Sequence, residues 1–298
     1  MLIQVVWQHT LHLTYVLPLM YPKDILKLSI VLSTQQTQFQ AATFSGSIET
    51  NLEKIARLGY QGVELAIRDP NLVDISNLAG LLKKNELVVP AIGTGQAWGE
   101  EGLSFTDPDP YVRSKAIDRI KSHIPLASLF GAVIIIGLIR GVVKPGVEEK
   151  QATAWLVEAL KECCYEANKS GVRLALEPIN RYETSLINNV RQGLELIQNV
   201  GAENFGLLLD TFHMNIEEAN IEKSIIDCGG EIFHFHVADS NRWYPGAGHL
   251  DFPRILRVLM GRGYKGFVSG EFLAKPDLDT AARETVKYMR KMGLEILN

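Results

Sequence analysis

The chain has 298 residues, of which 46% are hydrophobic and 21% charged, so it can bury a sizeable core. Its formal net charge of −4 at pH 7 argues against a surface for nucleic acids or anionic membranes. The three cysteines are Cys163, Cys164 and Cys228, an odd and unspaced set that excludes a disulfide framework or a zinc knuckle. We expect buried small side chains in a reducing, cytoplasmic compartment.

The first twenty residues carry no lysine or arginine and are interrupted by polar residues and a proline. A secretory signal needs a basic start, a clean apolar centre and a small-residue cleavage site, and a spanning helix needs about 20 apolar residues. We therefore interpret residues 1–24 as a leader that is disordered or results from a misassigned start. One catalytic domain is expected over 25–298.

From residue 27 onward, short apolar runs alternate with amphipathic helical patterns. We predict strands at 28–33, 62–65, 87–92, 132–137, 173–177, 205–209, 232–237 and 266–269. We predict helices at 48–58, 74–85, 110–129, 148–169, 189–200, 219–228, 251–262 and 277–292. This alternation indicates parallel strands joined by right-handed crossovers. Because no Gly-rich phosphate turn or Walker motif occurs, we predict a closed (β/α)8 TIM barrel rather than an open doubly wound sheet.

Helix ends carry the expected punctuation. Glycines follow the last periodic residues of five predicted helices, where the chain needs a left-handed turn: Gly59, Gly131, Gly171, Gly201 and Gly263. Asn188 precedes the helix at 189 and is predicted to cap its free N–H groups.

The last four predicted strands each end in a potential metal ligand. These are Glu177, Asp210, His236 and Glu271. Buried carboxylates are costly unless paired or bound to a cation, and the C-terminal strand ends of a barrel build its active site. Three carboxylates and one imidazole suit Mn²⁺, Co²⁺, Mg²⁺ or Fe²⁺ better than a thiolate-rich zinc site. His234 faces the same way as His236, so alternation cannot choose between them; we expect His234 to be a hydrogen-bonded core histidine.

The chain resembles the xylose-isomerase-like sugar isomerase/epimerase superfamily, and within it the D-tagatose/D-psicose 3-epimerase group. The resemblance covers residues 27 to 292. Its motifs are LALEPINRYET (174–184), LLLDTFHMNIEE (207–218), HFHVADSNRWYPGAGHLDF (234–252) and VSGEF (268–272).

That resemblance implies one divalent metal held by Glu177, Asp210, His236 and Glu271, with Mn²⁺ the expected ion and Co²⁺ or Mg²⁺ the alternatives. It further implies inversion of C3 of a ketose through a cis-enediolate. Glu177 and Glu271 are the catalytic pair, one on each face of that intermediate. A homo-oligomer, dimer or tetramer, is expected.

Three further residues match substrate-binding positions of that group. Glu183, His213 and Arg242 correspond to the Glu, His and Arg that hold O1 and O2 of the sugar. As alternatives, they could be a solvated loop acid, a helix cap and a loop salt bridge. Trp98 and Trp243 are weaker candidates for the apolar wall around the sugar tail, and either could be loop packing.

Arg140 follows the strand at 132–137 and is expected near the barrel mouth. A guanidinium there could bind a carboxylate or phosphate at the far end of a substrate, which would favour keto-hexonates or keto-uronates over neutral ketohexoses. The alternative is a surface arginine paired with an acid such as Glu148.

Three other functions differ from C3 epimerisation in the residues that they require. An aldose–ketose or hydroxypyruvate-type isomerase would use the same barrel. An AP endonuclease would need early-strand histidines, which this chain lacks between His12 and His123, and an Asp-Arg-His triplet where the chain has Asn241-Arg242-Trp243. A non-catalytic sugar-binding barrel would not require a glutamate on each face of the substrate, yet both Glu177 and Glu271 are present. We therefore expect a sugar or sugar-acid substrate, with no nucleic-acid or membrane partner.

Overall fold

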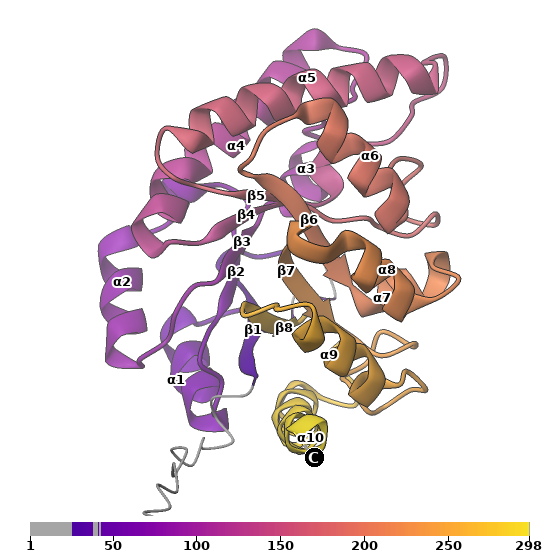
Figure 1. Cartoon of the computed structure of the whole chain (residues 1–298). Coiled ribbons are helices and arrows are strands. Elements are labelled where there is room, and N and C mark those ends of the chain that lie inside the picture. Colours follow the sequence, from indigo (N-terminus) through magenta and orange to yellow (C-terminus); the bar gives the residue numbers. More distant parts are fainter. Residues whose placement is uncertain (1–25, 38–40, 42, 298) are drawn as a thin grey trace, which may run out of the picture.

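The computed structural model describes residues 26–37, 41 and 43–297, and the predicted leader at 1–24 lies outside this part of the chain. Its parallel strands form a closed barrel in sequence order, in which β8 returns to pair with β1 (Figure 1). The strands are β1 (Lys27–Ser33), β2 (Glu64–Ala66), β3 (Ala91–Gly93), β4 (Val133–Ile136), β5 (Leu174–Leu176), β6 (Phe205–Asp210), β7 (Ile232–Val237) and β8 (Phe267–Gly270). The predicted (β/α)8 TIM barrel is confirmed.

Helices surround this barrel (Figure 1). They are α1 (Ile48–Leu58), α2 (Ile75–Lys84), α3 (Gln96–Glu101), α4 (Pro110–Phe130), α5 (Glu149–Asn168), α6 (Val190–Val200), α7 (Thr211–Glu217), α8 (Ile221–Cys228), α9 (Phe252–Gly261) and α10 (Leu278–Leu297). Short 3₁₀ turns are η2 (Pro70–Leu72), η3 (Leu138–Arg140) and η4 (Gly229–Glu231). The short helices α3 and α7 were not predicted. Both begin shortly after a strand ends, so they lie at the end of the barrel where active sites form.

Glycines end several helices as predicted. The glycines at 59, 131, 171, 201 and 263 have φ between 64° and 95°, a conformation that side chains with a Cβ rarely adopt. The predicted cap of α6 is wrong by one residue. Asn189, not Asn188, accepts from the backbone N–H of Gln192, whose side chain completes a capping box. The Asn188 amide instead donates to the carbonyls of Ile179 and Thr184, so it fixes the loop after β5.

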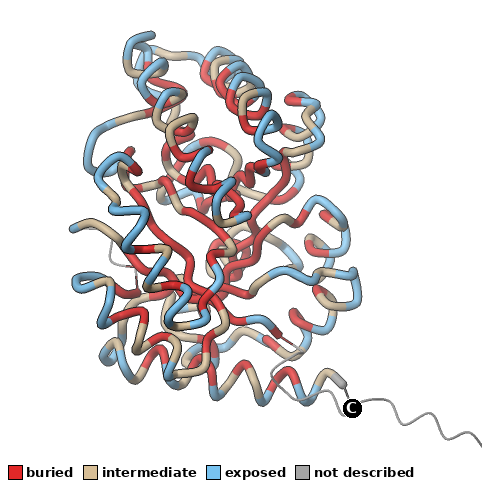
Figure 2. The backbone as a smooth tube through the Cα atoms, turned by 90° about the vertical axis from the view of Figure 1, so that its left-hand side faces the viewer, coloured by how far each residue is buried: buried red, intermediate tan, exposed pale blue. Residues whose placement is uncertain are grey.

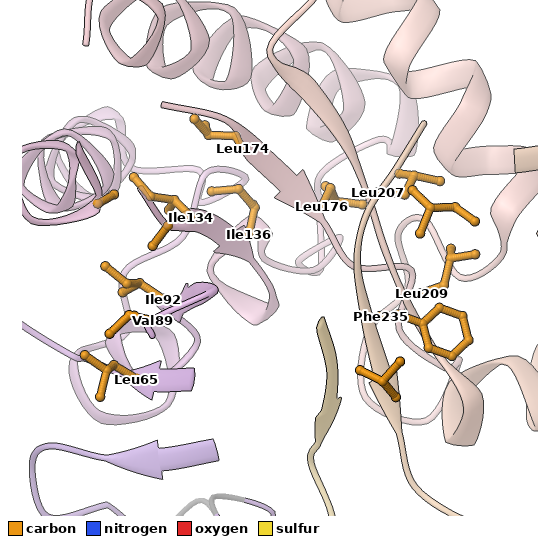
Figure 3. Packing of buried hydrophobic residues seen from close by; sticks show 14 of the residues in the cluster. Leu65, Val89, Ile92, Ile134, Ile136, Leu174, Leu176, Leu207, Leu209 and Phe235 are labelled. Carbon is orange, nitrogen blue, oxygen red and sulfur yellow. The ribbon is translucent and has the colours of Figure 1, made fainter. Parts of the chain in front are cut away.

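Strand residues alternate between two environments. One set packs between the strands and the helices, as Figure 3 shows for Leu65, Val89, Ile92, Ile134, Ile136, Leu174, Leu176, Leu207, Leu209 and Phe235. A much smaller apolar set is grouped separately: Ala91, Val133, Ile135, Ala175 and Leu208. These are the alternate strand positions, so they face the barrel interior. The outer layer therefore stabilises the barrel, and the interior keeps room for polar groups.

Burial follows the same plan. The strands are buried almost throughout, whereas the helices alternate between buried and exposed residues (Figure 2). Cys163, Cys164 and Cys228 are buried and unpaired, as expected. Within the described residues, no helix has the length and apolar character needed to cross a membrane.

Candidate active site

Four side chains from neighbouring strands meet at the C-terminal end of the barrel. Asp210 on β6 and His236 on β7 are register partners, while Glu177 and Glu271 directly follow β5 and β8. One ligand atom of each residue lies within 4.8 Å of the ligand atoms of the other three. The structure therefore brings together the side chains that the sequence placed at successive strand ends. We call these four residues the ligand cluster.

His236 presents one ring nitrogen to this cluster. Its Nδ1 lies 3.7 Å from Asp210 Oδ2, 3.8 Å from Glu271 Oε2 and 3.9 Å from Glu177 Oε1. Both His236 Nδ1 and Glu177 Oε1 are buried, and neither has a hydrogen-bond partner among residues 26–37, 41 and 43–297. A polar atom left this way is costly, and a cation between these atoms would satisfy both.

The donor set and its charge fit a divalent metal ion. Asp210 Oδ1 accepts from the backbone N–H groups of Phe212 and His213 at the start of α7, which leaves Oδ2 for the cluster. Burial lowers the pKa of His236, but the carboxylates of Glu64 and Glu271 outweigh it and raise that pKa well above its usual value. The cluster therefore attracts positive charge, and three carboxylates with one imidazole could hold a hard or borderline cation.

Glu64 is a functional residue that the sequence analysis missed. It lies on β2, is 2% exposed, and binds His234 Nε2 at 2.8 Å and His236 Nε2 at 2.9 Å. Burial raises the pKa of Glu64, yet the two imidazoles bring the net pKa well below its usual value. A carboxylate on the far nitrogen fixes the ring and tautomer of a metal-binding histidine. The sequence signal for Glu64 was a single acidic residue inside a predicted buried strand, because a buried carboxylate requires a partner.

The two candidate catalytic glutamates have unusual proton affinities. Burial raises the pKa of Glu271 to about 7. Burial, and then the nearby charge of Glu271, raises the pKa of Glu177 well above its usual value. Carboxyl groups with raised pKa values can exchange protons near neutral pH, as general acid–base catalysis requires.

Glu183, His213 and Arg242 form one hydrogen-bonded group beside the cluster. Arg242 Nη1 donates to Glu183 Oε1 at 2.9 Å, and Nη2 lies 3.6 Å from Glu271 Oε2. The Asn180 amide joins the group, since its Nδ2 donates to Glu183 Oε1 at 2.9 Å and lies 2.8 Å from His213 Nδ1. These contacts argue against an isolated loop acid at Glu183, whereas Arg242 does form the loop salt bridge that was its alternative. Asn180 lies in the motif at 174–184, but the sequence analysis predicted no role for it.

The same amide sets the protonation pattern of His213. A carboxylate only accepts, so the Asn180 atom facing Glu183 must be Nδ2, which donates its second hydrogen to His213 Nδ1. Burial lowers the pKa of His213 to about 4, so the ring is neutral near pH 7. Its hydrogen therefore lies on Nε2, which is 3.6 Å from Glu177 Oε1. His213 is a ready donor to an oxygen bound beside Glu177.

A cavity of about 310 Å³ opens above the cluster. Glu177, His236 and Glu271 line one part, with Glu183, His213 and Arg242 beside them. Trp98, Gln96 and Glu100 on α3 line another part, which agrees with the expected wall position of Trp98. Trp243 is not among the described residues that line it.

The structure places Arg140 behind the cavity wall. Arg140 is 0% exposed, so the alternative of a surface arginine paired with Glu148 is wrong. Its Nε donates to Gly137 O at 3.1 Å and its Nη1 to Ile187 O at 3.0 Å, and it is not among the described lining residues. These contacts help fix the loops after β4 and β5, whereas Arg140 Nη2 is buried without a hydrogen-bond partner among the described residues. Arg181, on the surface, pairs with Glu217 at 2.7 Å.

Comparisons with known proteins agree with this geometry. Residues 52–292 match the model of the xylose isomerase-like TIM barrel family. The chain is 32% identical to the D-psicose 3-epimerase of Ruminiclostridium cellulolyticum over 73% of its own length and 75% of that protein. It is 30% identical to the L-ribulose 3-epimerase of Mesorhizobium japonicum, over 81% and 80%.

Among solved structures, an L-ribulose 3-epimerase superposes with a TM-score of 0.77 at 26% identity, covering 91% of this chain and 95% of that one. The expected resemblance is confirmed at the level of sequence and of fold. The chain therefore belongs to the xylose isomerase-like TIM barrel family, and it is a carbohydrate isomerase of the ketose 3-epimerase type.

Proposed function

We propose that this protein is a metal-dependent epimerase that inverts C3 of a ketose. The observation that carries the proposal is the ligand cluster, in which His236 Nδ1 and Glu177 Oε1 are buried and face each other without a partner among the described residues. The activity named for its relatives, 3-epimerisation of L-ribulose or D-psicose, supports the same reaction.

Glu177, Asp210, His236 and Glu271 would hold the metal, for which Mn²⁺ is our expectation and Co²⁺ or Mg²⁺ the alternatives. When bound there, a divalent cation would polarise the ketose carbonyl and stabilise the negative charge that develops when C3 loses its proton. Asp210 and His236 would act as ligands alone, because Asp210 also caps α7 and His236 is held by Glu64.

The proton transfers fall to Glu177 and Glu271. Inversion of C3 requires removal of a proton on one face of the planar enediolate and return of a proton on the other. The two glutamates directly follow β5 and β8, on either side of the Asp210–His236 pair. One would accept the C3 proton as a carboxylate while the other donates as a carboxylic acid.

Substrate orientation would come from the group around Glu183. His213 would donate through Nε2 to a sugar oxygen beside Glu177, and Arg242 would donate beside Glu271. Glu183 would accept from a sugar hydroxyl while it orients Arg242. This is the O1 and O2 contact set expected from the sequence motifs.

The two glutamates could also serve a second reaction. An aldose–ketose or hydroxypyruvate-type isomerase moves a proton from a hydroxyl-bearing carbon to the neighbouring carbonyl carbon. The position of the exchanged hydrogen separates these cases, since epimerisation labels C3, whereas aldose–ketose isomerisation labels C2 of the aldose or C1 of the ketose.

Metal removal tests the proposal. The purified protein is stripped with EDTA, assayed on D-psicose, D-tagatose, D-fructose and L-ribulose, and then reloaded with Mn²⁺, Co²⁺ or Mg²⁺. We expect about one metal per chain by elemental analysis, loss of C3 epimers on stripping, and recovery on reloading. Full turnover by metal-free protein would contradict the proposal.

The proposal includes a homo-oligomer in the reducing cytoplasm. Three buried, unpaired cysteines support the reducing compartment. Light scattering coupled to size exclusion will give the oligomeric state, and a monomer at micromolar concentration would remove the oligomer from the proposal.

A further inference from the structure

The Gln96 side chain is fixed in one orientation in the cavity wall. Gln96 begins α3, is 5% exposed and lines the cavity. One end of its amide lies 2.8 Å from Ser33 Oγ, and the Ser33 hydroxyl donates to the carbonyl of Gln35 at 2.6 Å. The single hydroxyl hydrogen of Ser33 is thereby used. Ser33 Oγ can therefore only accept from Gln96, so the amide atom that faces it is Nε2.

The other amide atom, Gln96 Oε1, is an acceptor without a donor. It is buried, and it has no hydrogen-bond partner within the part of the chain that the structure describes. A buried acceptor without a donor costs free energy that a ligand hydroxyl would recover on binding. A carboxylate or an unprotonated phosphate oxygen has no hydrogen to donate, so it could not recover that cost.

Charge in the cavity points the same way. Its described lining includes five glutamates, Glu64, Glu100, Glu177, Glu183 and Glu271, but Arg242 is the single lysine or arginine there. Arg242 already contacts Glu183 and Glu271, and Arg140 lies behind the wall on backbone carbonyls. A carboxylate on the tail of a substrate would add negative charge to a cavity whose described lining offers Arg242 alone to balance it.

The position of Gln96 indicates which part of a substrate it meets. In the closed barrel β3 lies across from β7, and Gln96 follows β3 while His236 lies on β7. A sugar with its reacting carbons at the ligand cluster would direct its tail toward α3.

We propose that Gln96 Oε1 accepts a hydrogen bond from the C6 hydroxyl of the sugar, and that this contact selects neutral ketoses over keto-sugar acids, in which a carboxylate replaces that hydroxyl. The inference rests on the proposed function, since it assumes a ketose whose C2 and C3 lie at the cluster. Gln96 is thus a specificity-determining residue, and Ser33 is its positioning residue.

Deoxy sugars test the proposal. The wild type and Gln96→Leu are assayed on D-tagatose, its 5-deoxy and 6-deoxy derivatives, and D-tagaturonate, which carries a carboxylate at C6. We expect the wild type to lose about tenfold in kcat/KM on the 6-deoxy sugar, clearly less on the 5-deoxy sugar, and at least about tenfold on D-tagaturonate. Gln96→Leu should lose about tenfold on D-tagatose and nothing further on the 6-deoxy sugar.

One more variant keeps the test decisive. Ser33→Ala removes the acceptor that holds Nε2, so it releases the amide and should weaken the preference for the hydroxyl severalfold. Variants are compared at equal metal content and equal unfolding midpoint. Discrimination that survives in Gln96→Leu, or D-tagaturonate as the better wild-type substrate, would overturn this inference alone. Failure of the wild type to epimerise any ketose at C3 would instead overturn the proposed function.

Discussion

The two halves of the barrel contribute differently to the cavity. The half formed by β5–β8 ends in four ligand groups placed directly on or after the strands, at Glu177, Asp210, His236 and Glu271. The half formed by β1–β4 lines the cavity with small or apolar strand residues such as Ala66, Gly93 and Ile135, and with the short helix α3. Groups on strands are held more precisely than groups on loops. The β5–β8 half therefore suits chemistry, and the β1–β4 half suits recognition.

Glu64 is the exception to this division. It lies on β2, in the β1–β4 half, yet its carboxylate binds the imidazoles of His234 and His236 on β7. Glu64 thus links the two halves within the buried interior, although it carries no chemistry itself. The comparison predicts that variants of the ligand cluster affect kcat or metal binding, and that variants in the β1–β4 half, except Glu64, affect KM more than kcat.

The largest effect is expected for the catalytic pair. Glu177→Gln and Glu271→Gln should each lower kcat by at least ~10²-fold, because a proton-transfer group is lost while its shape is kept. Steady-state kinetics on the best ketose will measure this. The matched control is Glu222→Gln, which breaks only the pair with Arg254 and should leave kcat within about twofold. Either catalytic variant retaining more than about a tenth of wild-type kcat would break the assignment.

Metal affinity should respond next. Glu64→Gln should weaken Mn²⁺ binding about 10- to 100-fold, because the carboxylate that orients His236 is lost. Titration calorimetry on stripped protein will measure the dissociation constant without reference to turnover. Glu100→Gln, on α3, is the control and should leave it unchanged. An unchanged constant for Glu64→Gln would mean that Glu64 serves packing alone.

Arg140 should affect stability rather than specificity. Arg140→Met leaves the carbonyls of Gly137 and Ile187 without their donor and should lower the free energy of unfolding by about 1–2 kcal/mol. Arg181→Met, at the surface, should change it by less than about 0.5 kcal/mol. Urea unfolding compares the two. If Arg140→Met instead damaged activity on D-tagaturonate and spared neutral ketoses, a substrate contact would be supported.

The smallest effect is expected at the wall. Trp98→Leu should raise KM about two- to fivefold and leave kcat within about twofold, because the indole lines the cavity without reaching the ligand cluster. Steady-state kinetics will measure KM and kcat separately. A fall in kcat as large as that of Glu271→Gln would remove the division between the halves.

The sequence predicted the chemical half better than the recognition half, for a physical reason. Each member of the ligand cluster directly closes an apolar run, so alternation and barrel topology bring the members together. Glu64 was missed because Leu65 and Ala66 follow it, which conceals it within its strand. Gln96 was missed because α3 is six residues long and contains a glycine, so it lacks a helical repeat.

Side-chain direction was the other limit. Arg140 follows β4 at the end of the barrel that carries the ligand cluster, but the η3 turn directs its Nη1 to the loop after β5, and it is not among the described residues that line the cavity. The partners of Glu183 lie three residues away at Asn180 and far along the chain at Arg242. A single sequence carries no direct signal for such loop-to-loop contacts.

Hydrogen exchange with solvent tests the central claim most directly. The metal-loaded enzyme is allowed to act briefly on D-tagatose or D-psicose in ²H₂O, and deuterium is located by NMR in the product and in the recovered substrate. Two glutamates on opposite faces predict one deuterium at C3 of the product and almost none in the recovered substrate. Product without deuterium at C3, or an aldose product with deuterium at C2 instead, would contradict epimerisation by Glu177 and Glu271.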